Sequence, residues 1–242
     1  MRAIAGSPHL FIGGMSQEFL MNPVIVLNLK TYNESTGEKG LALCKIADEV
    51  ARSTGVLIIV APQNVDLFRV AKEVSIPVFA QHIDSNGPGA FTGTITADAV
   101  RAAGCRGTLL NHAERKIPFE KMQLAIELAR KAGIETLLCA DSVDEARKIA
   151  PLDPSYIAVE PPELIGSGIS VSKAKPEIVS DTVKEVKRIK NIPVLCGAGV
   201  SSGVDVKKAV ELGADGVLLA SAFVKAGNPR AVLLDMANSI KV

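Results

Sequence analysis

The chain has 242 residues, of which 48% are hydrophobic and 22% are charged, and its formal net charge is +1. This composition predicts a globular protein with a sizeable core and excludes a disordered chain. A charge so close to zero provides no overall field that would attract nucleic acid or an anionic membrane, and the apolar runs are far too short to span a bilayer, so neither partner is expected.

The first 22 residues contain one basic residue and an apolar stretch that is interrupted by glycine, serine and proline. Without a convincing cleavage site, this pattern disfavours a secretory signal. We expect residues 1–22 to be a leader or an extension added for expression, followed by one domain over residues 23–242.

The four cysteines are widely separated, and each lies among apolar residues. This pattern predicts buried, reduced thiols and therefore a cytoplasmic protein. The residues concerned are Cys44, Cys105, Cys139 and Cys196.

From residue 24 onward, short runs of Val, Ile and Leu alternate with amphipathic stretches at a spacing of roughly 25 residues. Most runs are apolar at consecutive positions, which is typical of parallel strands covered on both faces. The eight predicted strands cover residues 24–28, 56–60, 77–81, 107–111, 135–139, 156–160, 193–197 and 216–220.

The stretches between these strands have apolar residues at helical spacing and glycine at the end, as in residues 40–55, 118–133 and 202–216. Eight βα units in one domain predict a closed (β/α)8 barrel, because closure leaves no exposed sheet edge. An open doubly wound sheet is the alternative. The segment after the first strand, NLKTYNESTG, lacks the glycine-rich fingerprint that such a sheet usually carries.

In such a barrel the functional groups stand at the C-terminal ends of the strands. The first strand ends at Asn28 with Lys30 on the same side, the fourth is followed by His112, and the sixth ends at Glu160. Taken singly, a lysine here can be a surface residue and a histidine is more often structural, but a carboxylate that ends an apolar strand costs free energy unless it is paired or used.

The seventh and eighth strands end in CGAGVSSG and LLASA, whose small residues let backbone N–H groups approach an anion, and the first of these leads into a helix N-terminus. Helix capping and close packing explain the same residues equally well. Together with Lys30, His112 and Glu160, however, they predict proton abstraction beside the carbonyl of a small phosphorylated sugar.

Five segments in chain order carry a close resemblance to the triosephosphate isomerase family: NLKTY, NHAERK, VEPPELIGSG, GAGVSSGVDV and GVLLASAFVK. The resemblance extends from Val24 to Val242, and the segments VEPPELIG and CGAGV are similar to those of the archaeal branch of the family. It implies a single-domain TIM barrel, a small triose phosphate as substrate, no metal and no organic cofactor. It also implies a homo-oligomer, a homotetramer first and a dimer second.

The resemblance further implies a role for each site residue. Glu160 would be the general base, His112 would polarise the carbonyl as a neutral imidazole, and Lys30 would stabilise the oxyanion. The remaining substrate-binding residues would be Asn28, Ile165, Gly166, Gly199, Ala220 and Ser221. Residues 161–168 would form a lid, stiff at Pro161 and Pro162 and loose at Gly166 and Gly168.

Two departures from the family pattern stand out. Ala113 replaces a serine whose hydroxyl could hold Glu160 in the resting state, which leaves the resting pose of the base open. Ala220 and Ser221 replace two glycines at the eighth strand, where backbone amides alone are needed. Glu114 is expected to be a structural partner of Lys30 or of a nearby backbone group, in preference to a direct role in proton transfer.

Two alternative functions remain. A pentose-phosphate epimerase would need metal ligands or paired aspartates at strand ends, for which His82 and Asp84 are the candidates. A barrel that binds a phosphorylated metabolite without turnover would not need Lys30, His112 and Glu160 together.

Overall fold

A computed structural model describes residues 23–165 and 170–240, so the predicted leader over residues 1–22 lies outside the described residues. The described part of the chain forms eight strands that pair only in parallel. They are β1 (Val24–Asn28), β2 (Ile58–Ala61), β3 (Phe79–Ala80), β4 (Gly107–Leu110), β5 (Glu135–Ala140), β6 (Tyr156–Val159), β7 (Val194–Cys196) and β8 (Gly216–Leu219).

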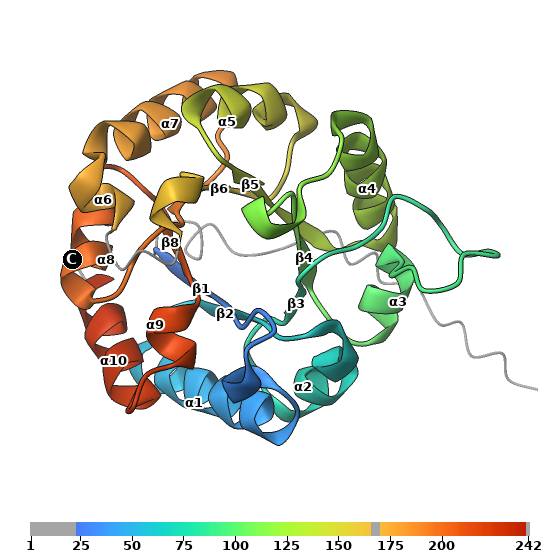
Figure 1. The fold of residues 1–242 in the computed structure, drawn as a ribbon, viewed down its shortest axis with the longest axis horizontal. Coiled ribbons are helices and arrows are strands. Elements are labelled where there is room, and N and C mark those ends of the chain that lie inside the picture. The colour runs from blue at the N-terminus through green and yellow to red at the C-terminus, as the bar shows by residue number, and fades with distance from the viewer. Residues whose placement is uncertain (1–22, 166–169, 241–242) are drawn as a thin grey trace, which may run out of the picture.

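The strands form a barrel, as predicted (Figure 1). Their order is β2-β1-β8-β7-β6-β5-β4-β3, and a parallel bridge between Val60 and Val78 joins the two ends of the sheet. The open doubly wound sheet is therefore excluded. All eight strands run parallel around the closed ring. Their C-terminal ends therefore meet at one mouth.

Helices surround the barrel on its outside (Figure 1). The longest follow the first, fourth and sixth strands, and the helix after β5 has only seven residues. The helices are α1 (Glu38–Thr54), α2 (Leu67–Glu73), α3 (Ala97–Ala102), α4 (Phe119–Ala132), α5 (Val143–Ile149), α6 (Val171–Ala174), α7 (Pro176–Ile189), α8 (Gly203–Glu211), α9 (Ser221–Val224) and α10 (Pro229–Ile240).

Several predicted strands are longer than those observed. The third is the clearest case, since residues 77–81 were expected and only Phe79–Ala80 form β3. Pro77 has no N–H to donate to a ladder. The side chain of Gln81 donates to the carbonyl groups of Lys30 and Ala61, each at 3.0 Å. It thereby connects the loop after β1 to the end of β2.

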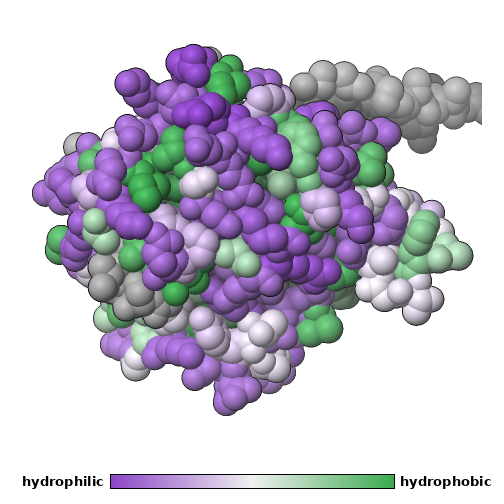
Figure 2. Space-filling model, turned by 45° about the horizontal axis from the view of Figure 1, so that its top comes forward, coloured by the Kyte–Doolittle hydropathy of each residue, from purple (hydrophilic) through white to green (hydrophobic). Residues whose placement is uncertain are grey.

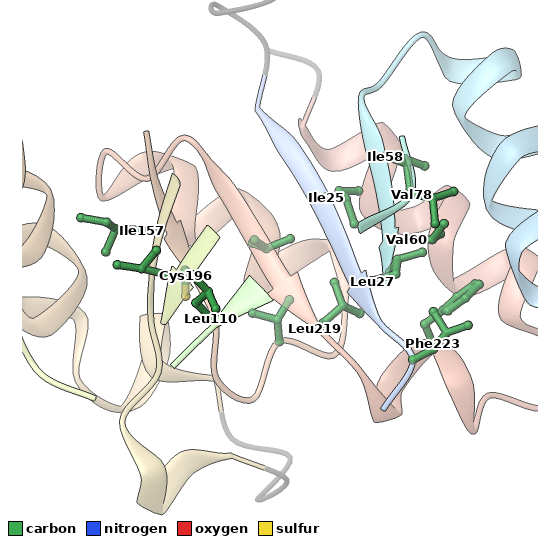
Figure 3. Close-up of a cluster of buried hydrophobic side chains, with 14 of the residues drawn as sticks. Ile25, Leu27, Ile58, Val60, Val78, Leu110, Ile157, Cys196, Leu219 and Phe223 are labelled. Atoms are coloured by element: carbon green, nitrogen blue, oxygen red, sulfur yellow. The ribbon is translucent and has the colours of Figure 1, made fainter. Parts of the chain in front are cut away.

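Alternation along the strands divides the core into two layers. Val24 and Val26 belong to the cluster inside the barrel, whereas Ile25 and Leu27 belong to the larger cluster between barrel and helices. Figure 3 shows part of that outer cluster, where side chains of β1, β2 and β8 pack together with Phe223 of α9. The same alternation turns Asn28 of β1 toward the inside of the mouth.

The cysteines lie in these two layers. All four are buried and none forms a disulfide, as the sequence predicts. Within the described residues, no helix combines the length and apolar character needed to cross a membrane. The face in Figure 2 is largely hydrophilic, with hydrophobic residues scattered between polar ones.

Candidate active site

A cavity of about 220 Å³ lies at the mouth of the barrel. It is lined by side chains from the ends of distant strands, among them Lys30, His112 and Glu160. The other predicted site residues that line it are Asn28, Ile165, Gly199, Ala220 and Ser221. Gly166 lies outside the described residues. The structure therefore brings the described residues of the predicted site together in one place.

Lys30 is held in an unusual backbone conformation, with φ of 48°. Its N–H donates to Asn28 Oδ1 at 3.0 Å, and its carbonyl accepts from Gln81 Nε2 at 3.0 Å. A positive φ is costly for a residue with a side chain, and such strain persists only where the surroundings fix it. The backbone is thus fixed so that the ammonium group reaches the cavity.

The Lys30 ammonium forms an ion pair with Glu114, with Nζ and Oε1 2.7 Å apart. Only 12% of the Lys30 side chain is exposed, whereas 58% of the Glu114 side chain is. The prediction that Glu114 is a structural partner of Lys30 is confirmed in this geometry.

His112 is buried and has a defined orientation. Its Nδ1 accepts the backbone N–H of Glu114 at 3.1 Å, within the 3-10 turn Ala113–Arg115. Burial and the nearby Lys30 ammonium lower the pKa of His112, against the opposing effect of Glu114. The neutral ring then carries its proton on Nε2, which points into the site as a hydrogen-bond donor.

The N–H that meets the ring thus belongs to the short turn directly after His112. This N–H orients the imidazole but is not a leading cause of its lowered pKa. The leading causes in the structure are burial and Lys30.

Glu160 is a buried carboxylate with spare bonding capacity. Only 3% of the residue is exposed, and Oε2 has no hydrogen-bond partner within residues 23–165 and 170–240. Burial raises the pKa of Glu160 to about 7, although a hydrogen bond from the Cys139 thiol and the Lys30 charge oppose the rise. Such a carboxylate is a stronger base than a solvated one and has a lone pair free to accept a proton.

His112 and Glu160 face each other across the cavity, with Nε2 and Oε2 3.7 Å apart. This distance is too long for a hydrogen bond, so each group retains its capacity to contact a small molecule bound beside them. With Ala113 in place of serine, Glu160 rests against Cys139 and opposite His112.

Gly197 makes room for Glu160, a role that sequence reasoning missed. It follows β7, beside β6, and a Cβ atom built on it would lie 2.3 Å from Glu160 Cγ. No real Cβ tolerates such a contact, so any larger residue would displace the base. The sequence places Gly197 at the end of the strand after the one that ends at Glu160. That these two strands are paired in the barrel is known only from the structure.

Tyr32 was also missed. It lines the same cavity, and the Lys225 ammonium lies 4.3 Å from the centre of its ring. The contact is a cation–π interaction that connects the loop after β1 to the end of α9. Its place two residues after Lys30 in NLKTY could have suggested it.

The expected phosphate side of the cavity is lined by Gly199, Ala220 and Ser221. The N-terminus of α8, for which the sequence left helix capping and an anion site as equal explanations, is already occupied. Asp205 Oδ2 accepts from the backbone N–H groups of Ser201 and Ser202, both at 3.0 Å, and Asp235 Oδ2 accepts from that of Gly203 at 2.7 Å. An anion would therefore have to use Gly199 and the start of α9, at Ala220 and Ser221, instead of the N-terminus of α8.

The first half of the expected lid is ordered beside the base. Pro162–Leu164 form a 3-10 turn, and Ile165 lines the cavity. An ion pair between Glu163 and Lys175 connects this turn to the N-terminal side of α7. Gly166 and Gly168 lie outside the described residues.

His82 and Asp84, the candidate residues of the epimerase alternative, form a structural contact. Their Nε2 and Oδ1 atoms lie 3.4 Å apart, while Asp84 Oδ2 accepts the backbone N–H of Ile95 at 2.7 Å. Across residues 23–165 and 170–240, no group of three or more His, Cys, Asp or Glu side chains is arranged to hold a metal ion. No observation here favours that alternative.

Comparison with known proteins identifies relatives over nearly the whole described chain. The family model for triosephosphate isomerase matches residues 23–240. A triosephosphate isomerase from Methanocaldococcus jannaschii is 52% identical over 206 residues, which cover 85% of this chain and 94% of that protein. Those from Methanobacterium bryantii and Methanosarcina acetivorans are 47% and 45% identical, covering 92% and 89% of this chain and 99% and 97% of the respective relatives.

Proposed function

Since the chain belongs to the triosephosphate isomerase family, we propose that it interconverts dihydroxyacetone phosphate and D-glyceraldehyde 3-phosphate. The observation that carries this proposal is the pair of buried groups at the mouth, a carboxylate with an unpartnered oxygen and a neutral imidazole 3.7 Å away. The reaction belongs to glycolysis and gluconeogenesis.

Glu160 is the general base in this proposal. Its Oε2 takes a proton from the carbon next to the substrate carbonyl, and the electrons of that C–H bond form the carbon–carbon double bond of an enediolate. The protonated carboxyl then returns the proton to the adjacent carbon. A pKa near 7 suits both halves of the cycle, since the group can accept and release a proton at neutral pH.

His112 serves the oxygen atoms of the substrate. Its Nε2–H donates to the carbonyl oxygen as negative charge develops there, and the ring transfers a proton between the two oxygens. Nδ1 is held by the N–H of Glu114, which supports the assignment of the proton to Nε2. The neutral form is the useful one, because it donates from Nε2 without adding a full charge to the ground state.

Lys30 supplies the positive charge of the site. Its ammonium stabilises the developing oxyanion, and its buried position strengthens that interaction relative to water. Asn28 orients the substrate oxygens from the end of β1. The ion pair with Glu114 fixes the ammonium in place before the substrate arrives.

The phosphate group is assigned to the side of the cavity lined by Gly199, Ala220 and Ser221, with Ile165 and Gly166 from the lid segment. Backbone N–H groups of these loops are the donors in this assignment. Closure of residues 161–168 over the substrate would exclude water, which protects an enediolate phosphate from losing its phosphate group and strengthens the base.

The protein is further proposed to act in the cytoplasm as a homo-oligomer, a homotetramer first and a dimer second, without nucleic acid or membrane partners. Exposed apolar side chains support self-association: Val65 is 88% exposed and Phe91 is 53% exposed. Phe91 lies on the segment between β3 and α3, which projects from the side of the barrel (Figure 1). Light scattering on the purified protein measures the subunit number.

A coupled isomerase assay tests the proposed reaction. The parent protein is expected to turn over both triose phosphates. Glu160→Asp retracts the carboxylate by one methylene, and a misplacement of about 1 Å can cost roughly 100-fold in rate. Glu211→Asp is the matched control, since Glu211 is half exposed on α8 and pairs only loosely with Lys208 at 3.8 Å. A parent without turnover, or a Glu160→Asp variant with the parent's rate, overturns the proposal.

A further inference from the structure

Asn111 ties the segment that carries His112 to the rest of the barrel. It directly follows β4, is 1% exposed, and has a positive φ of 59°. Its Oδ1 accepts the backbone N–H of Ile117 at 3.2 Å, which closes residues 111–117 into a loop around His112. Its Nδ2 donates to the carbonyl of Cys139 at 2.9 Å and to Glu145 Oε1 at 2.8 Å. The side-chain amide therefore spans three elements.

Glu145, in the first turn of α5, is the centre of this network. Besides Asn111, it accepts from Lys116 Nζ at 2.9 Å on Oε1 and 2.8 Å on Oε2, and from the backbone N–H of Asp141 at 2.7 Å. Lys116 also pairs with Asp141 at 3.0 Å. One carboxylate thus binds both ends of the His112 segment and the residue after β5. This bonding is far denser than a surface ion pair provides.

The network also connects the two reacting groups. The carbonyl of Cys139 accepts from Asn111, and the thiol of the same residue interacts electrostatically with Glu160. His112 and Glu160 are consequently fixed relative to a single point, the end of β5. The two groups lie 3.7 Å apart, and each is linked to the same residue at the end of β5.

We propose that Glu145 is a positioning residue for the reaction, which acts through Asn111 and Lys116 to hold His112 Nε2 opposite Glu160. Glu145 does not line the cavity, so its effect is on the placement of the imidazole and not on contact with the substrate. The inference rests on the proposed isomerase function. It predicts that loss of Glu145 lowers kcat while the grip on the phosphate, on the other side of the cavity, keeps KM nearly unchanged.

The test compares four proteins in the coupled isomerase assay: the parent, Glu145→Ala, Glu145→Gln and Asp144→Ala. Glu145→Ala removes the acceptor of Asn111 and the partner of Lys116, and kcat is expected to fall about tenfold with KM within about twofold. Glu145→Gln keeps an amide oxygen for Asn111 and is expected to recover part of the loss. Asp144→Ala is the matched control, since Asp144 is the preceding residue of α5, 86% exposed, and pairs with Arg147.

Asn111→Gly provides a second variant if Glu145→Ala fails to fold. Glycine accepts the positive φ at this position, so the backbone is kept and only the side-chain clamp is lost. The same fall in kcat at nearly constant KM is expected. Circular dichroism at the assay temperature gives the folded fraction, and kcat is expressed per folded molecule.

A readout independent of turnover is the long-range proton–nitrogen NMR spectrum of the imidazole rings. The chain has three histidines, and His112→Gln assigns the signal of interest. The parent is expected to show a proton on Nε2 and an accepting Nδ1, and Glu145→Ala is expected to shift these nitrogen signals while Asp144→Ala leaves them unchanged.

The outcomes separate the two proposals. An active parent whose Glu145→Ala variant matches Asp144→Ala in kcat and in the imidazole spectrum overturns the role of Glu145 alone. An inactive parent overturns the proposed function, and the NMR comparison then still shows whether Glu145 positions His112. A drop in kcat that disappears when it is expressed per folded molecule also contradicts the positioning role.

Discussion

Two buried carboxylates at opposite ends of the barrel differ in how completely they are paired. Asp48 of α1 lies near the N-terminal end of β3, where its Oδ1 accepts the backbone N–H groups of Ser75 at 2.9 Å and Ile76 at 3.2 Å. Its Oδ2 lies 3.2 Å from Arg52 Nη2. Glu160 at the mouth has one oxygen without a hydrogen-bond partner in the part of the chain that the structure describes.

The pairing decides the direction of each pKa shift. Burial acts to raise the pKa of Asp48, but the hydrogen bonds from Ser75 outweigh it, so that pKa is lowered. Burial raises the pKa of Glu160 to about 7, because a single thiol bond and the Lys30 charge do not compensate for lost solvation. A paired buried charge stabilises structure, whereas an unpaired one is poised for proton transfer.

Lys30→Ala is expected to have the largest effect, because it removes the cation that the mouth holds for the developing oxyanion. Turnover in the isomerase assay should fall below detection, while circular dichroism shows an intact fold. Lys190→Ala is the control, since Lys190 is half exposed and pairs with Asp153 on the surface. Unchanged activity in Lys30→Ala removes this residue from the mechanism.

Gly197→Ala is expected to move the Glu160 carboxylate, the less completely paired of the two, out of its position in the site. The new Cβ would lie 2.3 Å from Glu160 Cγ, so the base must shift, and we expect kcat to fall about 100-fold. Gly87→Ala is the control, because a Cβ there meets nothing within 4 Å. Steady-state kinetics give the comparison, and equal kcat in both variants would show that Gly197 does not set the position of the base.

The contributions of Glu160 and Asp48 to the free energy of unfolding should change with pH in opposite directions. The pKa of Glu160 is raised by folding, so its stabilising contribution exists at low pH and is lost as the pH rises from 4.5 through about 7. Glu160→Gln should therefore be more stable than the parent at pH 9, by up to about 3 kcal/mol, and equal to it near pH 4.

For Asp48 the sign is reversed. Its pKa is lowered by folding, so its contribution is present above the unfolded value and is lost as the pH falls through the folded one. Asp48→Asn should lose about 1–3 kcal/mol at pH 7, with kcat unchanged. Urea unfolding at several pH values and one fixed protein concentration measures both variants. Two variants with pH dependences of the same sign would contradict the distinction.

The sequence predicts the barrel and most of the site for a simple physical reason. Parallel strands that are buried on both faces have continuous apolar runs in the sequence. A charged residue at or just after the end of such a run, such as Lys30 or Glu160, is therefore easily identified. The dependence of Glu160 on Gly197 and the clamp of Asn111 on Glu145 were not predicted. Both join residues on neighbouring elements, and nothing local in the chain marks them.

The phosphate side shows the reverse case, in which a local signal allowed two interpretations, helix capping or an anion site. The segment GVSSGVDV marks the start of a helix correctly, and α8 begins at Gly203. Whether the N–H groups there are free depends on Asp205 in the same helix and on Asp235 in α10. A helix N-terminus read from sequence therefore predicts a helix more securely than it predicts an anion site.

Incorporation of solvent deuterium into the substrate tests the central claim most directly, namely that the Glu160 carboxylate carries the proton between adjacent carbons. Dihydroxyacetone phosphate is incubated in deuterium oxide with the parent or with Glu160→Gln, and carbon-bound deuterium is followed by NMR. The account predicts deuterium at the reacting carbons with the parent and none above the protein-free control with the variant. Incorporation by Glu160→Gln at the parent's rate would contradict it.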